Sequence, residues 1–189
     1  VMKYLKICFV GLVISCSSTP VKKLPEMPGA YFMTSQTVHN GEGETNYTDL
    51  KQLKIYTGHY MMYTQVNPED SASAFGVGSY TTDTSGVTEN VIYSSRDSFF
   101  DNSPAQYKLT ITPTTDGYNQ VISDIVIDSQ KSLLTEVYQK VGSSVKSDLD
   151  GVWRESDAYD IRGTDTARKN RTQYKAFYRG YFMFGHSVN

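Results

Sequence analysis

Residues 105–112 read AQYKLTIT, and this stretch decides between helix and strand. Its apolar residues Tyr107, Leu109 and Ile111 alternate with polar ones, so the hydrophobic period is two rather than 3.6. A period of two places every second side chain on one face of a pleated strand. Comparable runs follow one another from residue 29 onward, separated by segments rich in Gly, Pro, Asn, Asp and Ser, which are typical turn residues.

The spacing of these runs predicts an all-β fold. Short strands joined by tight turns are typical of a sandwich or an up-and-down barrel. We expect an antiparallel up-and-down meander that closes into a barrel, with no competing helical segment. The strands are expected near residues 30–38, 53–66, 74–82, 87–94, 106–113, 118–127 and 132–141.

Composition and motifs argue against several classes of function. The chain has 189 residues and a formal net charge of −2, and it carries no Lys/Arg block, so we expect no nucleic-acid partner. Both cysteines, Cys8 and Cys16, precede the body of the chain, which therefore has no disulfide or thiolate metal site. No phosphate loop, nucleophile elbow or ligand-spaced histidine pair is present. The sequence predicts no catalytic residue, no metal site and no cofactor, so the protein is not expected to be an enzyme.

Residues 1–15, VMKYLKICFVGLVIS, have the pattern of a signal peptide. Lys3 and Lys6 precede an apolar run that is too short for a membrane span of about 20 residues. The following VISC resembles the bacterial lipobox, in which the cysteine is acylated and becomes the new N-terminus. The resemblance implies lipidation of Cys16 and a membrane anchor. The alternative is an ordinary signal peptide with an incidental cysteine.

A flexible tether is expected over residues 16–28, which contain three prolines and no periodicity. The tether lacks the acidic run that resembles surface-export signals of Bacteroidetes-type lipoproteins. We therefore expect a cell-envelope protein that is lipid-anchored to the outer membrane and faces the periplasm.

Part of the sequence occurs twice at nearly constant spacing. The repeated unit is about 120 residues, the size of a small domain. Residues 29–149 form a full copy, and residues 150–189 read as the first two strands of a second copy. The matches are Lys54, Tyr60 and Met62 with Lys175, Tyr181 and Met183, and Gly29-Ala30-Tyr31 with Gly151-Val152-Trp153. We expect a fragment or shortened form of a two-barrel protein. In the alternative, residues 151–189 add strands to the first barrel.

The tripeptide Gly151-Val152-Trp153 resembles the Gly-x-Trp opening of lipocalins and lipocalin-like domains, which occur on bacterial lipoproteins of the Bacteroidetes type. The first copy has Tyr31 where this tryptophan would stand, and no further lipocalin motif is evident. The resemblance implies a lipocalin-like barrel over residues 29–149. It also implies a structural role for Trp153, which in lipocalins closes the base of the barrel.

The strand around Tyr60 and Met62 is apolar on both faces, which indicates either a packed core or a cavity lining. With Tyr31, these residues are the candidate ligand-binding positions, since Tyr and Met suit an adaptable cavity. We expect non-enzymatic binding of a small amphipathic ligand or of an envelope partner. The first alternative is a structural or interaction module with a filled core, and the least supported is a hydrolase or isomerase in a barrel cavity.

Overall fold

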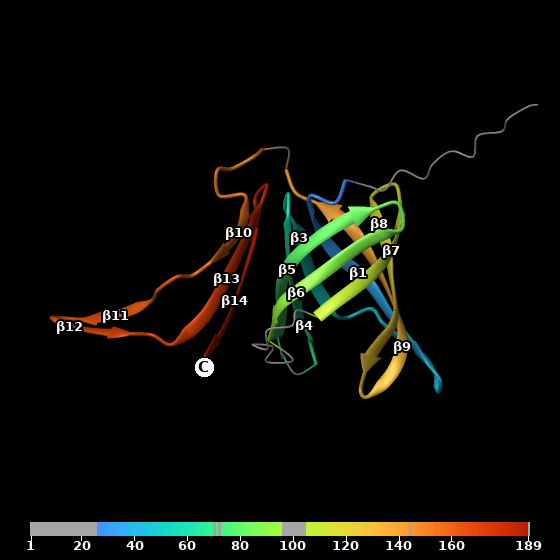
Figure 1. The fold of residues 1–189 in the computed structure, drawn as a ribbon, viewed down its shortest axis with the longest axis horizontal. Helices are drawn as coiled ribbons and strands as arrows, with labels where there is room; N and C mark the ends of the chain where they lie inside the picture. Colours follow the sequence, from blue (N-terminus) through green and yellow to red (C-terminus); the bar gives the residue numbers. More distant parts are fainter. Residues whose placement is uncertain (1–25, 70, 72, 96–104, 144, 189) are drawn as a thin grey trace, which may run out of the picture.

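The computed structural model describes residues 26–69, 71, 73–95, 105–143 and 145–188. The expected signal peptide, the lipidation site Cys16 and most of the tether lie outside the described residues. The described part is all-β, without a helix, and forms a barrel with a smaller sheet beside it (Figure 1).

The barrel is an antiparallel up-and-down meander of eight strands that closes on itself, as the sequence predicted. Each strand pairs with the next along the chain, and β1 pairs with β9 to close the ring. A ninth strand, β2, pairs with the far end of β1. The bounds are β1 (Gly29–Asn40), β2 (Gly43–Tyr47), β3 (Lys51–Tyr56), β4 (Tyr60–Val66), β5 (Ser73–Asp83), β6 (Gly86–Ser94), β7 (Ala105–Pro113), β8 (Gly117–Ile127) and β9 (Gln130–Val141).

Two expected elements differ in the structure. A single strand over residues 53–66 is wrong, because a turn separates β3 from β4, and in this turn the Thr57 N–H donates to the Tyr60 carbonyl at 2.8 Å. Residues 39–46, which lie between two expected strands, form instead the end of β1 and most of β2. Asn40 closes this hairpin, since its side-chain oxygen accepts hydrogen bonds from the backbone of Glu42 and Gly43.

The C-terminal region forms five strands rather than the two that were expected. The order β10-β13-β14 makes one sheet, and β11 and β12 make a separate hairpin. A strand opening at Gly151 was expected, but the hairpin of β11 and β12 was not, because its strands have only four residues each, too few to show a period in the sequence. The turn between β13 and β14 was not foreseen either, as with β3 and β4. Their bounds are β10 (Gly151–Arg154), β11 (Tyr159–Arg162), β12 (Asp165–Arg168), β13 (Arg171–Tyr178) and β14 (Tyr181–Val188).

The sequence repeat extends to the backbone pairing. In the barrel, Ala30 pairs with Ile55 and Ile55 with Met62; in the C-terminal unit, the equivalent Val152 pairs with Ala176 and Ala176 with Met183. The hairpin of β11 and β12 likewise corresponds to that of β1 and β2. The C-terminal unit therefore reproduces the four strands β1–β4, with β10 and β11 together in the place of the long β1.

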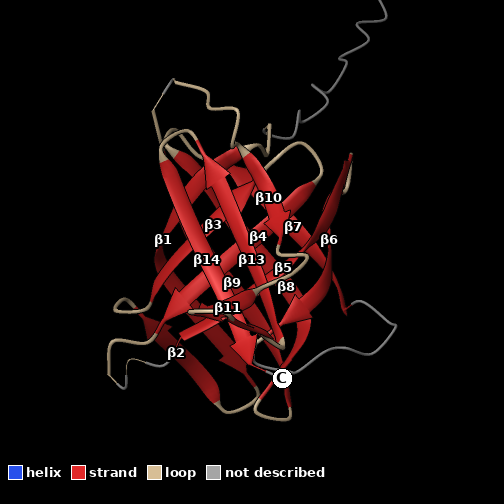
Figure 2. Ribbon diagram, turned by 90° about the vertical axis from the view of Figure 1, so that its left-hand side faces the viewer, coloured by secondary structure: helices blue, strands red, loops and turns tan. Residues whose placement is uncertain are grey.

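The C-terminal sheet packs face-on against the outside of the barrel. Figure 2 looks onto this sheet and shows β10, β13 and β14 lying over the barrel wall. The shared cluster includes Ile55, Met62 and Phe75 from the barrel with Ala176 and Met183 from the sheet. In the described part of the chain, no strand of this unit joins the barrel's hydrogen-bonded ladder, contrary to the alternative of added strands. The two copies thus bury equivalent outer faces against each other.

Candidate functional site in the barrel interior

The interior of the barrel holds polar and charged side chains that come from alternate positions of its strands. Along β3, Gln52, Lys54 and Tyr56 point inward, whereas Leu53 and Ile55 point outward and pack with the C-terminal sheet. This alternation follows from the two-residue period of a strand. The three inward side chains are all buried, so the first candidate site is an enclosed one.

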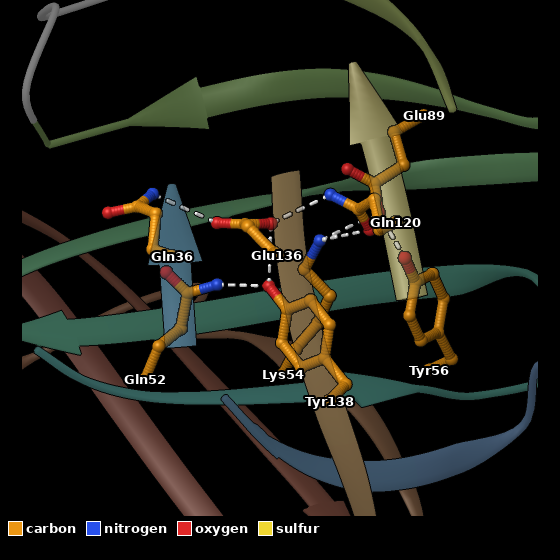
Figure 3. Close-up of polar contacts among 8 residues, drawn as sticks. All are labelled: Gln36, Gln52, Lys54, Tyr56, Glu89, Gln120, Glu136 and Tyr138. Atoms are coloured by element: carbon orange, nitrogen blue, oxygen red, sulfur yellow. Dashed lines mark hydrogen bonds and ion pairs between the residues drawn. The ribbon is translucent and has the colours of Figure 1, made fainter. Parts of the chain in front are cut away.

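One half of the interior network centres on Lys54. Its Nζ lies 3.2 Å from Glu89 Oε1, and it also donates to Gln120 Oε1 at 3.3 Å. The Tyr56 hydroxyl donates to the same oxygen of Glu89. These four residues come from β3, β6 and β8, so the network crosses the barrel rather than following one wall (Figure 3).

The other half centres on Glu136 of β9. Gln120 Nε2 donates to Glu136 Oε2 at 2.8 Å, and the Tyr138 hydroxyl donates to the same oxygen at 2.9 Å. Gln36 Nε2 donates to Glu136 Oε1 at 3.2 Å, and Gln52 Nε2 donates to the Tyr138 hydroxyl. Gln120 therefore joins the two halves, since it accepts from Lys54 and donates to Glu136 (Figure 3).

Burial sets the electrostatics of this site. Lys54, Glu89 and Glu136 are only 3%, 3% and 4% exposed, so one cation lies with two carboxyl groups away from water. Burial raises the pKa of Glu136 above its ordinary value, and this outweighs the opposing effects of the Lys54 charge and the Tyr138 hydrogen bond. Protonation of Glu136 would leave Lys54 and Glu89 as a neutral pair.

Aromatic rings pack around the network and fill the space beside it. The rings of Tyr118 and Tyr138 stack with centroids 4.9 Å apart, and Tyr31 meets Tyr118 edge-on at the same distance. Burial raises the pKa of Tyr31 to about 12. Met27, only 2% exposed, packs in the same cluster, and its carbonyl accepts a hydrogen bond from the Tyr31 hydroxyl at 3.1 Å. Direct contacts between side chains thus occupy the part of the interior beside the network, and at the end of the barrel near Glu26 the rings of Tyr31 and Tyr118 also line a pocket of about 500 Å³.

Of the three candidate ligand-binding residues, only Tyr31 faces the interior. Tyr60 is 51% exposed, and Met62, although fully buried, belongs to the outer cluster under the C-terminal sheet. The expected inward facing of Tyr60 and Met62 is therefore wrong by one residue, and Met61 takes the interior position. The sequence could not choose between the faces of β4, because both are buried along most of its length.

Trp153 does not close a barrel base in the described part of the chain. Its side chain is 51% exposed on the open C-terminal sheet. Its Nε1 donates to the carbonyl of Leu149 at 2.9 Å, four residues back. Tyr31, its equivalent in the first copy, also donates to a carbonyl four residues back, that of Met27. The ring position is thus repeated, but only Tyr31 is enclosed.

The charged residues of the interior were not predicted as site residues from the sequence. Lys54 is recognisable in the sequence only as a repeated position, whereas Glu89 alternates with Val87 and Val91 on one face of its strand. A carboxylate amid apolar neighbours on one face is a signal of a buried, paired charge. Its partner could not be identified, because Lys54 and Glu89 are brought together only by closure of the barrel.

A second notable surface is the face of the C-terminal sheet that points away from the barrel. Phe177 and Phe182 stack with ring centroids 6.0 Å apart, and Phe184 stacks on His186 at 6.4 Å. Phe182 and Phe184 are 61% and 54% exposed. A shallow groove of about 360 Å³ lies among these rings and is also lined by Gln173 and Lys175. This surface, called the aromatic face below, comprises Trp153, Gln173, Lys175, Phe177, Phe182, Phe184 and His186.

No group of three or more His, Cys, Asp or Glu side chains within the described ranges is placed to hold a metal ion. Nor does the described chain contain a helix long and apolar enough to cross a membrane.

Comparison with protein-family models, with curated proteins and with solved structures found no match to this chain. The molecule is defined by its architecture: a closed antiparallel barrel with a charged, hydrogen-bonded interior, carrying a partial copy of itself on its outer wall.

Proposed function

We propose that this chain is a non-enzymatic interaction module of the cell envelope, in which the barrel is a closed scaffold rather than a carrier. The observation that supports this most directly is the network that links Lys54, Glu89, Gln120, Glu136 and Tyr138 across the interior. These side chains meet one another directly, so they occupy the volume in which a lipocalin-like barrel would hold a ligand.

A ligand in this interior would have to separate the charged groups. Removing one partner of a buried ion pair costs about 3–5 kcal/mol, because the other charge is left without compensation. An amphipathic molecule would have to offset that cost for Lys54 and Glu89 before it gained any affinity. The closed network therefore favours a scaffold that binds partners on its surface.

The expected location at the envelope depends on Cys16, which lies outside the described residues. The lipobox-like VISC supports acylation there, and two acyl chains would give stable attachment. The chain from Cys16 to Pro25 would then act as a tether that holds the barrel at the membrane surface. The expected bound at Pro28 is too long, because Met27 already packs in the barrel interior.

One observation favours the second candidate function, the binding of a small amphipathic ligand. The Tyr118 hydroxyl is buried among the described residues without a hydrogen-bond partner. A buried polar group without a partner is unfavourable, and a water or the polar end of a ligand would satisfy it. This candidate requires a rearranged interior, since Tyr118 is packed between the rings of Tyr31 and Tyr138.

Native mass spectrometry of the protein purified from its host membrane tests the proposal. A scaffold gives the mass of the polypeptide with its acyl chains and no further retained molecule. Stoichiometric retention of a small molecule, lost on Tyr118→Phe, would identify a carrier instead. Cell fractionation of Cys16→Ser tests the anchor separately, and persistence of this variant in the membrane fraction would contradict it.

A further inference from the structure

The two copies of the four-stranded unit are covered differently on equivalent faces. In the first copy, the second edge of β4 pairs with β5, and strands β5–β9 enclose the inner face. In the second copy, β14 pairs only with β13 within the described residues, and the equivalent inner face is the aromatic face. Among the described residues, the C-terminal sheet therefore has both an uncovered face and an unpaired edge.

The exposed fractions of equivalent residues show how differently the inner faces of the two copies are covered. Tyr31 is 3% exposed, whereas its equivalent Trp153 is 51% exposed. Met61 is fully buried, whereas its equivalent Phe182 is 61% exposed. The opposite face does not differ, since Met62 and its equivalent Met183 are both buried in the contact between the copies. The outer face of the second unit is thus already occupied, and its inner face is not.

The first copy indicates what chemistry covers such a face. Strand β5 places Gly76 opposite Tyr63, and a Cβ atom at Gly76 would lie 2.4 Å from the Tyr63 ring. Strand β6 then brings Glu89 to Lys54. The cover consists of an antiparallel pair of strands, with a glycine beside the aromatic ring of the edge strand and a carboxylate for the lysine.

The second unit has the same two features that a cover must match: an aromatic ring on the edge strand and a lysine on the neighbouring strand. Phe184 stands at the position of Tyr63, and Lys175 stands at the position of Lys54. Lys175 is exposed and has no hydrogen-bond or salt-bridge partner among the described residues, although its charge contributes to lowering the pKa of Glu155. The nearby Arg171 is paired with Glu155 at 2.7 Å, so the side chain of Lys175 is the cation left for an acidic partner.

We propose that the aromatic face and the free edge of β14 bind a β-hairpin segment of a partner protein. The first strand of that hairpin pairs with β14 and has a glycine beside Phe184, and the second strand presents a carboxylate to Lys175. This inference rests on the proposed interaction function and names its surface and partner class. Edge pairing supplies backbone hydrogen bonds, and the side-chain positions supply specificity.

A second copy of this chain fits the surface less well. Two aromatic faces packed together would bring Lys175 against Lys175, and like charges at a contact are unfavourable. Glu155, a carboxylate at the edge of this sheet, is held by Arg171.

The test uses the full chain and a synthetic peptide of residues 73–95, which form β5 and β6 in the barrel. Isothermal titration should show saturable one-to-one binding, and hydrogen exchange should show new protection of β14 amides. Lys175→Glu should weaken binding at least about tenfold, and Glu89→Lys in the peptide should restore it. Gly76→Val in the peptide should abolish binding. A version closed by a disulfide between cysteines added at its ends covers the case in which the linear peptide does not form a hairpin.

Several outcomes would overturn the proposal. These are no binding by either peptide, binding unchanged in Lys175→Glu, protection that appears at β4 through strand exchange in the barrel, or self-association of the full chain through the aromatic face. None of them would place a ligand in the barrel. A failed docking surface is therefore distinguishable from a failed scaffold function, which retention of a small molecule would reveal.

Discussion

Lys54 and Lys175 hold the same position in two copies of one four-stranded unit, yet Lys54 is buried beside Glu89 and Lys175 is exposed to solvent. Their strand neighbours correspond as well: Lys54 lies between Tyr31 and Tyr63, and Lys175 lies between Trp153 and Phe184. The unit itself is therefore the same in both places, and the environment of the lysine depends on what covers the sheet.

This difference gives a matched pair of variants. Lys54→Met leaves Glu89 buried without its cation, so the free energy of unfolding should fall by about 3–5 kcal/mol. Lys175→Met changes an exposed side chain and should alter it by no more than about 0.5 kcal/mol. Chemical denaturation of both variants checks the prediction. Equal effects would mean that the buried pair does not hold the interior together.

The direction in which the β4 side chains point gives a second matched pair of variants. Met61 is fully buried in the interior cluster and Tyr60 is 51% exposed, although they are neighbours in the sequence. Met61→Ala should lower the free energy of unfolding by about 2–5 kcal/mol. Tyr60→Ala should lower it by less than about 1 kcal/mol, since it removes little buried surface. Thermal or chemical denaturation measures both, and a larger loss for Tyr60→Ala would restore the facing first expected from the sequence.

The fold could be predicted because its signals are local. The two-residue period of AQYKLTIT and the Gly- and Asn-rich turns each specify strands and hairpins without reference to distant residues. The repeat from Gly29 to Gly151 could be recognised for the same reason. The facing of β4 could not be predicted, because an apolar pattern on both faces does not distinguish a barrel interior from a contact with a second sheet.

The candidate site could be predicted only in part. Tyr31 was identified because it lies in the repeated opening tripeptide. Lys54, Glu89 and Glu136 lie far apart in the sequence, and although Glu89 stands among apolar neighbours, no local pattern identifies its partner. Their relationship is created by closure of β1 on β9, which no local pattern encodes. The outer wall around Ile55 could not be interpreted from local sequence either. This wall is apolar because the C-terminal sheet covers it.

The raised pKa of Glu136 predicts a pH dependence of stability. Its ordinary value is 4.5, and the folded protein holds the proton to higher pH. As the pH rises above about 4.5, the unfolded chain loses this proton before the folded one does, which favours unfolding. The free energy of unfolding of the native protein, relative to that of Glu136→Gln, should therefore fall with rising pH and level off once Glu136 ionises in the fold. Denaturation at a series of pH values measures this difference, and a difference that rises with pH would contradict the assignment.

The contact between the two copies predicts which face of the C-terminal sheet holds this sheet against the barrel. Met183 is 5% exposed against the barrel, whereas its neighbour Phe182 is 61% exposed on the aromatic face. Met183→Ala should destabilise the docked sheet by about 2 kcal/mol or more. Amides of β13 would then exchange roughly thirtyfold faster, because local opening sets their rate. Phe182→Ala is the control and should leave the exchange rate of the β13 amides nearly unchanged. Neither variant should change the exchange rate of the amides of β8 and β9. If Phe182→Ala had the larger effect, the sheet would be held by its aromatic face instead, and that face would not be free to bind a partner.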